Sequence, residues 1–307
     1  MVFAMGFSAY GGAEVLRRID VDVPAPAAGQ VRVRVRCAGV NPMDWKLRSG
    51  RMAAVRPLSL PHVPGLEAAG IVESVGPDAD PWRVGDEVLG PVSAGYAVQT
   101  LARADRLVAK PPGLPWELAG GLPTASETAY RTLTALGVAK DDTLLVHGAA
   151  GGVGSLAVQF AVSAGVRVIG TASPGNHDYL RSLGAEPVAY GEGVGARVRE
   201  LAPDVNAVLD AAGRGVLPES VDLAGGASRV LSIADAAGAQ AVGARFSSQA
   251  DGEDQHVAGI ERALALYRDG RLHLPVWRAL PLAEAADAHR ESEGGHLRGK
   301  IVLVAAG

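Results

Sequence analysis

Four glycines in one short turn carry the strongest chemical signal of the sequence. The apolar run Thr143–His147 leads into Gly148-Ala-Ala-Gly-Gly-Val-Gly154, and apolar residues then recur at helical spacing over Ser155–Val162. A buried parallel strand leads into a helix in this way, and the first amides of that helix have no partner within it. Glycines let the backbone approach a bound pyrophosphate closely, and the helix dipole favours an anion there. We therefore interpret the turn as the pyrophosphate site of a nicotinamide dinucleotide. A tight turn that binds nothing is the open alternative, because the chain contains 40 glycines.

The residues after the next predicted strand, Arg167–Thr171, indicate which dinucleotide would bind. An NAD site usually carries an acidic residue about 20 residues past the glycine turn, where it binds the ribose diol. This chain has Thr171-Ala-Ser173 there, followed by Asn176 and His177. Hydroxyl groups and a protonatable side chain suit a 2′-phosphate better than a free diol, so the sequence favours NADPH over NADH. In the alternative, Asn176 only caps a helix and His177 is solvated.

A third candidate group lies in Gly39-Val-Asn-Pro-Met-Asp-Trp-Lys-Leu-Arg-Ser-Gly50. Asn41 and Asp44 suit the start of a short helix, with a proline at its first position. Lys46 carries a positive charge that could polarise a carbonyl or bind a ribose hydroxyl. The segment is therefore either a capped structural helix or a corner of a site.

Two further segments combine polar residues with apolar surroundings. Glu67 lies inside the apolar run of Pro61–Val72, and a buried carboxylate needs a partner. Thr128 belongs to Leu122–Leu133, whose hydroxyl groups either cap a helix or line a pocket at a domain junction. His62 lies near Glu67, but one histidine and one carboxylate do not make a zinc site.

The remaining lone residues receive structural interpretations. We expect His147 to be structural, Cys37 to be a small buried residue, and His289 and His296 to be surface residues. With only one cysteine, an intramolecular disulfide and a four-cysteine zinc site are excluded.

Composition limits the class of protein. The 307 residues are enough for about two domains, and 48% hydrophobic with 20% charged residues suits a large core. The net charge is −4 without a basic block, which argues against binding to nucleic acid or an anionic membrane. The sequence lacks a signal peptide pattern and an apolar run of about 18 residues, so we expect a cytoplasmic protein without a membrane span.

The order of the predicted elements indicates two domains. Residues 1–122 are expected to form a β-rich barrel domain, because Val31-Arg-Val-Arg-Val-Arg36 alternates and prolines separate short segments such as Gly70–Val75 and Glu87–Leu89. From 123 to 260, strands alternate with helices, which predicts a doubly wound parallel sheet. The strands are expected at Thr143–His147, Arg167–Thr171, Pro187–Tyr190, Ala207–Asp210, Arg229–Ile233 and Ala241–Phe246, with helices over Ser155–Ala164, His177–Leu183 and Gly195–Leu201.

Residues 261–307 are expected to return to the first domain. The tail predicts a helix over His256–Arg268, a strand over Pro275–Leu280, a helix over Leu282–Glu293 and a strand over Lys300–Val304. Ser247–Gln255 is polar and unpatterned, which is typical of a mobile loop.

Taken in order, these segments resemble the zinc-independent quinone oxidoreductase group of the medium-chain dehydrogenase/reductase superfamily. The motifs that carry the resemblance are Tyr10-Gly-Gly-Ala-Glu-Val-Leu16, Val40–Gly50, Pro64–Val72, Val84-Gly-Asp-Glu-Val88, Gly148–Gly154 and Gly299-Lys-Ile-Val302. The resemblance implies a GroES-like β-barrel domain and a Rossmann domain, with the site in the cleft between them. It also implies NADPH as cofactor, and often a homodimer joined through the edge strand near Ala241–Phe246.

The resemblance further implies a metal-free site. Zinc alcohol dehydrogenases of the superfamily have a cysteine where this chain has Asn41 and a histidine where it has Leu66. Many members of the zinc-independent group have a tyrosine in place of Lys46, and the Asn-Pro-x-Asp-x-Lys form resembles a subgroup that reduces enones. Asn176-His177 replaces the usual phosphate-site lysine or arginine.

The resemblance also implies roles for individual residues. The catalytic corner comprises Asn41, Asp44 and Lys46. Thr128 resembles a nicotinamide-ribose or amide contact. The pyrophosphate turn comprises Gly151, Gly152 and Val153. The 2′-phosphate pocket comprises Ser173, Asn176, His177 and Tyr190. The cofactor cleft is completed by Ala211, Ser232, Ile233, Phe246, Ser248 and Arg298.

We therefore expect an NADPH-dependent reductase that transfers hydride to a quinone or an α,β-unsaturated carbonyl compound without a metal. Two alternatives remain at this point. One is an NADPH-binding protein with little catalysis, such as a sensor or a non-redox pathway partner, and the other is a tailoring reductase that acts on one bulky natural product.

Overall fold

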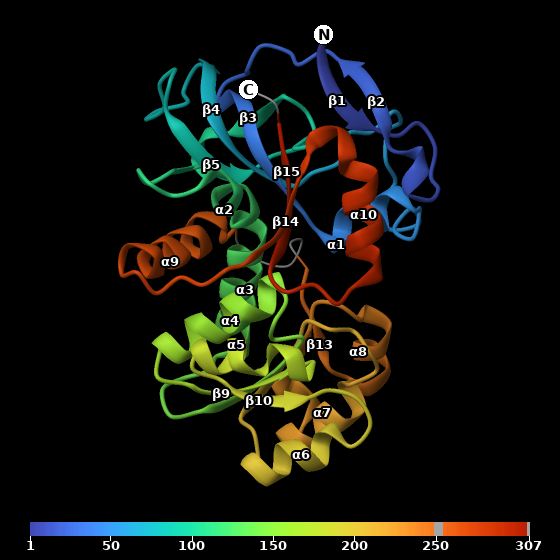
Figure 1. The fold of residues 1–307 in the computed structure, drawn as a ribbon, viewed down its shortest axis with the longest axis vertical. Coiled ribbons are helices and arrows are strands. Elements are labelled where there is room, and N and C mark those ends of the chain that lie inside the picture. Colours follow the sequence, from blue (N-terminus) through green and yellow to red (C-terminus); the bar gives the residue numbers. More distant parts are fainter. Residues whose placement is uncertain (249–253, 306–307) are drawn as a thin grey trace. The chain divides into compact units, whose positions relative to one another are not determined.

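The computed structural model of the chain describes residues 1–248 and 254–305 and divides into two compact units (Figure 1). The first unit comprises Met1–Thr124 and Pro275–Gly307, and the second comprises Ala125–Leu274. The predicted boundaries at 122 and 260 therefore differ from the observed ones mainly at the second crossing, where helix α9 (His256–Arg268) belongs to the second unit.

The first unit is built on a 7-stranded sheet in which most neighbouring strands are antiparallel. Its central strand is the alternating segment, where Val31, Val33 and Val35 are buried and the intervening arginines are partly exposed. The strand order is β14 (Val276–Pro281), β15 (Lys300–Val304), β3 (Gln30–Val40), β4 (Glu67–Val75), β5 (Glu87–Pro91) and β7 (Val108–Ala109), with β6 (Gln99–Arg103) paired to β3. The C-terminal strand β15 pairs with β3, so the tail returns to this unit as expected.

Shorter elements surround this sheet. Strands β1 (Val2–Gly6) and β2 (Arg17–Val21) form an antiparallel pair, and the helices are α1 (Pro42–Arg48), α2 (Trp116–Gly121) and α10 (Ala285–Gly294). Single 3-10 turns occur at Ala13–Val15, Ala104–Arg106 and Leu282–Glu284. Cys37 is fully buried in β3, where a Cβ on Gly120 of α2 would lie 2.7 Å from its Cβ.

The second unit contains a 6-stranded parallel sheet in the order β10-β9-β8-β11-β12-β13. The strands are β8 (Thr143–His147), β9 (Arg167–Ala172), β10 (Glu186–Ala189), β11 (Ala207–Asp210), β12 (Val230–Ser232) and β13 (Arg245–Phe246). The chain winds outward from β8 to β10 and then returns to β11, which lies on the other side of β8. Ligands of such sheets bind at this reversal, beyond the carboxyl ends of β8 and β11.

Helices connect these strands. They are α3 (Pro123–Leu136), α4 (Gly152–Ser163), α5 (His177–Ser182), α6 (Val194–Leu201), α7 (Leu217–Ala224), α8 (Ala236–Val242) and α9, with 3-10 turns at Pro174–Asn176 and Ala227–Arg229. Within the part of the chain that the structure describes, each unit contains a cluster of buried apolar residues.

The strand predicted over Ala241–Phe246 is mostly wrong. Residues 241 and 242 end helix α8, and only Arg245–Phe246 pair with β12. Asp235 caps α8 by accepting a hydrogen bond from the Gly238 amide at 2.8 Å, and Gly243 ends it with φ +70°. The cap and the alanine-rich sequence between these two residues favour a helix over a strand. The predicted loop Ser247–Gln255 lies partly outside the described residues.

Candidate active site

The glycine turn joins β8 to α4 at the reversal of the sheet. Gly148 has φ +73°, and a Cβ on Gly154 would lie 2.2 Å from the Gly148 carbonyl oxygen. Gly151, the residue before α4, provides no side-chain cap, and Gly151, Gly152 and Val153 are partly exposed. The first amides of this 12-residue helix therefore fit a pyrophosphate, whose charge the helix dipole would stabilise.

Polar side chains fix the strand ends around this turn. Asp210 is fully buried, and its Oδ1 accepts hydrogen bonds from the amides of Ala212 and Gly213, both at 2.9 Å. Its Oδ2 accepts a bond from Ser232 Oγ at 2.7 Å. The hydroxyl of Ser232 therefore donates its proton within the protein. Ala211, which is partly exposed, lies next to the glycine turn. Ile233, also partly exposed, donates its amide to the Asp210 carbonyl at 3.0 Å.

His147, at the end of β8, is structural in the sense expected. Its ring nitrogens lie 3.3 Å from Thr171 Oγ1 and 3.1 Å from Ser220 Oγ. Burial lowers the pKa of His147 to about 4, so the ring is neutral at pH 7. The Gly148 amide donates to the same Thr171 hydroxyl at 3.3 Å, which ties the glycine turn to β9.

The segment after β9 contains three of the four residues predicted for the 2′-phosphate pocket, namely Ser173, Asn176 and His177. Asn176 Nδ2 donates to Ser173 Oγ at 3.1 Å, and the partly exposed His177 has a buried Nε2 without a partner among the described residues. Tyr190 follows β10 and is 47% exposed. Arg197, which the sequence did not single out, donates to the Ala189 carbonyl at 2.9 Å and so supports the loop that carries Tyr190. The unpartnered ring nitrogen of His177, the amide of Asn176 and the hydroxyl of Ser173 together fit a 2′-phosphate better than a ribose diol.

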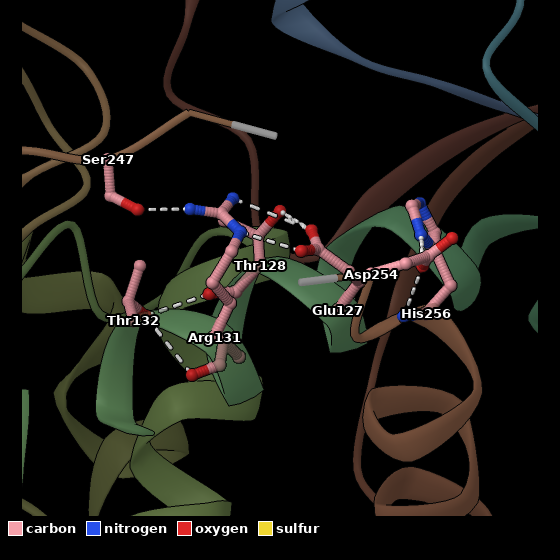
Figure 2. A network of polar contacts seen from close by, with 8 residues as sticks. Glu127, Thr128, Arg131, Thr132, Ser247, Asp254 and His256 are labelled. Carbon is pink, nitrogen blue, oxygen red and sulfur yellow. Dashed lines mark hydrogen bonds and ion pairs between the residues drawn. The ribbon is translucent and has the colours of Figure 1, made fainter. Parts of the chain in front are cut away.

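Helix α3 carries Thr128 within a buried polar cluster (Figure 2). Thr128 is 8% exposed, and its Oγ1 donates to Glu127 Oε2 at 3.1 Å. Arg131, one helical turn later, pairs with Glu127 at 2.6 Å and also binds Ser247 Oγ. Glu127 and Arg131 were not predicted. Their i, i+4 spacing is the sequence signal that could have indicated the pair.

In the first unit, Asn41 is held by two charged side chains. Its Nδ2 donates to Glu67 Oε1 at 2.8 Å, and its Oδ1 accepts from Lys300 Nζ at 2.6 Å. Lys300 also binds Glu67 Oε1 at 2.8 Å, and the Thr124 amide donates to Glu67 Oε2 at 2.7 Å. All three side chains are buried. The carboxylate Glu67 therefore has the partners that its apolar sequence context required.

Asp44 links this corner to a second buried chain of contacts. Its Oδ2 accepts from the Asn41 amide at 2.8 Å and from Tyr96 Oη at 3.2 Å, and His289 Nε2 lies 3.1 Å from the same Tyr96 oxygen. Burial raises the pKa of Asp44 to about 7. The expectation that His289 is a surface residue is wrong: helix α10 buries it completely, and burial, helped by Arg48, lowers its pKa to about 3.

Of the three predicted catalytic residues, only Lys46 is partly exposed. Asn41 and Asp44 are buried, with 6% and 0% of their surface exposed. Lys46 Nζ lies 5.8 Å from the centre of the Trp45 ring. Partial burial and the nearby Arg51 lower the pKa of Lys46 below its usual range. Its ammonium group is thus the donor that this corner can offer to a ligand.

The remaining predicted cofactor contacts are Phe246, Ser248 and Arg298. Phe246 is 41% exposed, and Ser248 follows it at the end of the described segment. Arg298 lies between α10 and β15 in the first unit. Among residues 1–248 and 254–305, no group of three or more His, Cys, Asp or Glu is placed to hold a metal ion, and no helix there is long and apolar enough to cross a membrane.

Comparison with known proteins places the chain in a family. The alcohol dehydrogenase GroES-like domain matches residues 27–133, and a family described as zinc-binding dehydrogenase matches residues 183–303. Quinone oxidoreductase of Pseudomonas aeruginosa is 32% identical over 97% of this chain and 98% of its own length. The chloroplastic NADPH-dependent alkenal/one oxidoreductase of Arabidopsis thaliana is 31% identical over 97% of this chain and 78% of its own.

A solved structure agrees with this placement. A mycobacterial protein solved in complex with NADPH has a TM-score of 0.84 and 29% sequence identity, covering 99% of this chain and 100% of that chain. Some curated relatives extend far beyond the match: the chain spans only 5% of the polyketide synthase GfsB of Streptomyces halstedii, to which it is 32% identical over 280 residues. The GroES-like unit, the parallel dinucleotide-type sheet and these relatives show that the chain is an oxidoreductase of the medium-chain dehydrogenase/reductase superfamily, in its quinone oxidoreductase group.

Proposed function

We propose that this protein is an NADPH-dependent reductase that transfers hydride to a quinone or an α,β-unsaturated carbonyl compound without a metal ion. The observation that carries the proposal is the glycine turn at the reversal of the parallel sheet, where Gly154 leaves no room for a Cβ and the first amides of α4 have no side-chain cap. The relatives named for quinone and alkenal/one reduction support the choice of acceptor.

NADPH, when bound, would supply the hydride. Gly151, Gly152 and Val153 would hold its pyrophosphate, and Ser173, Asn176 and His177 its 2′-phosphate. The contact between Asn176 and Ser173, together with the buried, unpartnered Nε2 of His177 in the described chain, supports the preference for a phosphate.

In the first unit, we assign Lys46 to the substrate. An ammonium group near the acceptor oxygen, directly or through a ribose hydroxyl, would stabilise the negative charge that develops there. Asn41 and Asp44 would act through their hold on helix α1, because their side chains are buried in protein contacts. We propose that the final proton comes from water.

The metal-free reaction is supported by the residues at the corner. Asn41 and Leu66 stand where zinc enzymes of the superfamily have a cysteine and a histidine, and the one cysteine of the chain is buried in β3. A test is to dialyse the protein against a chelator and assay it with and without added Zn²⁺. We expect equal rates, and a loss of activity that Zn²⁺ restores would contradict a metal-free mechanism.

The central experiment is a panel of quinones and enones assayed with NADPH and with NADH. We expect turnover of some acceptors with a lower KM for NADPH, and Gly152→Asp should abolish it because a carboxylate would repel the pyrophosphate. His177→Ala should raise the KM for NADPH while leaving that for NADH unchanged. Tight binding of NADPH without oxidation by any acceptor would instead support a binding protein with little catalysis.

We further propose a cytoplasmic homodimer. The lone buried cysteine suits a reducing compartment. Among the described residues, β13 is an edge strand of the second unit's sheet. We propose that its Arg245–Phe246 backbone pairs with the same strand of a second copy. Sedimentation over a range of concentrations tests the dimer, and a monomer at all concentrations would exclude it.

A further inference from the structure

Glu127 and Arg131 form an ion pair that is almost completely buried on helix α3. The two side chains are 2% and 6% exposed, Arg131 Nε lies 2.6 Å from Glu127 Oε1, and Arg131 Nη2 lies 3.5 Å from Glu127 Oε2. Helix α9 packs directly on this turn, because a Cβ on Gly259 would lie 2.7 Å from the Glu127 Cα. The close packing of α9 on the backbone of α3 therefore fixes the position of the ion pair.

The guanidinium of Arg131 has a second partner far away in the sequence. Figure 2 shows it between the Glu127 carboxylate and Ser247, to whose hydroxyl Nη1 donates a hydrogen bond. The Ser247 amide donates in turn to the Ser232 carbonyl at 3.0 Å, which continues the edge of the sheet past β13. Arg131 thus ties helix α3 to the segment that contains Phe246.

Glu127 also determines how Thr128 can bind a ligand. Thr128 Oγ1 donates its only proton to Glu127 Oε2 at 3.1 Å. A hydroxyl that has donated its proton can only accept further hydrogen bonds. Thr128 therefore presents an acceptor, and its ligand must offer a donor such as the NH₂ of a carboxamide or a hydroxyl group.

We propose that Glu127 and Arg131 are positioning residues for the nicotinamide end of the cofactor: Glu127 orients Thr128 to accept a hydrogen bond from the carboxamide, and Arg131 fixes the Phe246–Ser247 segment. This inference rests on the proposed function, because it assumes that NADPH binds at the carboxyl ends of the parallel strands. Correct orientation of the reacting ring matters strongly, since a displacement of about 1 Å can cost about 100-fold in rate.

The sharpest test is Ser247→Ala, which removes the bond to Arg131 and leaves the ion pair in place. We expect kcat with NADPH to fall about tenfold, and the primary isotope effect with 4-deuterated NADPH to rise because hydride transfer becomes more rate-limiting. Binding of adenosine 2′,5′-bisphosphate, which lacks the nicotinamide half, should change by less than about twofold, as for sites that share no partner.

Two more variants separate positioning from folding. Arg131→Lys keeps the charge beside Glu127 but loses the planar fork, so it should behave like Ser247→Ala. Arg131→Met leaves Glu127 buried without a cation and should also lower the unfolding midpoint. Ser163→Ala is the matched control: it removes an Arg262–Ser163 bond of 2.6 Å within the same unit, at the far end of α4, and should leave kcat and the isotope effect unchanged.

The outcomes distinguish this proposal from the proposed function. A wild-type protein that neither binds NADPH nor reduces an acceptor would refute the function itself. A wild-type protein that turns over normally, with Ser247→Ala and Arg131→Lys giving the same kcat and isotope effect, would refute the positioning role alone. A loss of affinity for adenosine 2′,5′-bisphosphate equal to the loss for NADPH would also refute it, because the effect would not be confined to the nicotinamide end.

Discussion

At the scale of single residues, one ammonium group holds together the buried polar corner around Asn41 in the first unit. Lys300 Nζ contacts Asn41 Oδ1 at 2.6 Å, Glu67 Oε1 at 2.8 Å and the Val40 carbonyl at 3.4 Å. Its donors are used within the protein, so Lys300 supports the structure of this corner. Asn41 is consequently fixed by both ends of its amide, and helix α1 begins from a defined position.

Replacing Lys300 should therefore destabilise the first unit. Lys300→Met leaves the Glu67 carboxylate buried without a cation, which typically costs ~3–5 kcal/mol in the free energy of unfolding. Urea unfolding measures this difference. Arg167→Met is the control: its partner Glu186 and Arg167 itself are 42% and 43% exposed, and an exposed pair contributes up to about 1 kcal/mol. Equal losses in the two variants would mean that the Lys300 cluster is not desolvated in solution.

Asp44 should make stability depend on pH in an unusual direction. Burial raises its pKa from 3.8 to about 7, so between these pH values the native protein keeps a proton that the unfolded chain has lost. The free energy of unfolding should then fall as pH rises through this window. Asp44→Asn cannot titrate, although its amide oxygen can still accept the bond from the Asn41 backbone.

The measurement is urea unfolding of both proteins at several pH values from about 4 to 7. The buried histidines His147 and His289 act in the opposite direction, because their lowered pKa values make stability fall as pH decreases. They are present in both proteins, so the difference between the two curves isolates Asp44. Wild type should lose stability relative to Asp44→Asn as pH rises, and parallel curves would show that folding does not raise the pKa of Asp44.

At the scale of elements, the glycines of the β8–α4 turn have two different roles. A Cβ on Gly154 would lie 2.2 Å from the Gly148 oxygen and 2.8 Å from the Ala149 Cα, so this glycine permits close packing of the helix on its own turn. A Cβ on Gly151 would meet the Gly148 oxygen only at 3.4 Å, which is an ordinary contact. Gly151 is therefore free to serve the approach of a ligand.

This difference predicts that two similar substitutions have different effects. Gly154→Ala should lower the free energy of unfolding by about 1–3 kcal/mol, as overpacking does. Gly151→Ala should keep the stability of wild type but weaken NADPH binding, because its methyl group would stand where the pyrophosphate approaches. Thermal unfolding and calorimetric titration with NADPH measure the two effects. The assignment of roles is wrong if Gly151→Ala unfolds as readily as Gly154→Ala.

Local sequence patterns were sufficient for most elements but not for the edge of the sheet. Alternating valines predicted β3, and the apolar run before the glycine turn predicted β8, since both depend on neighbours in the sequence. The segment Ala236–Val242 could not be recognised as a helix from its period, because small alanine and glycine side chains give no apolar contrast. Its cap Asp235 was the available signal.

At the scale of the whole molecule, each unit has its own sheet and its own apolar cluster. Cofactor binding should therefore stabilise the two units unequally. At a free NADPH concentration of about 100 times Kd, the second unit should gain about 2.7 kcal/mol. Amide hydrogen exchange should then show more added protection in β8 and β11 than in β3 and β4.

Equal added protection in all four strands would contradict this expectation and show that the units unfold as one. Gly152→Asp provides the control, because it should remove the NADPH-dependent protection while leaving the strands of the first unit unaffected.

The candidate site was predictable only where its chemistry is local. The glycine turn and the acid-free end of β9 stand in contiguous segments, so the sequence was enough to predict a phosphate site there, and that site stays a prediction. Glu67 could be recognised as needing a partner, but Lys300 lies 233 residues away and no pattern connects them. The bond between Arg131 and Ser247 spans 116 residues and depends on the fold in the same way. Burial of His289 likewise follows from the packing of α10, not from its neighbours in the chain.

The buried position of Cys37 has a consequence if, as we propose, this protein reduces quinones or enones. Quinones and enones alkylate thiolates, so an exposed reactive cysteine would be consumed by the acceptor. The only cysteine of this chain is 0% exposed beneath helix α2, and burial raises the pKa of its thiol well above its usual range. The folded protein thus offers no thiolate for such adduct formation, and it should keep its activity through long exposure to the compounds that we propose as its substrates.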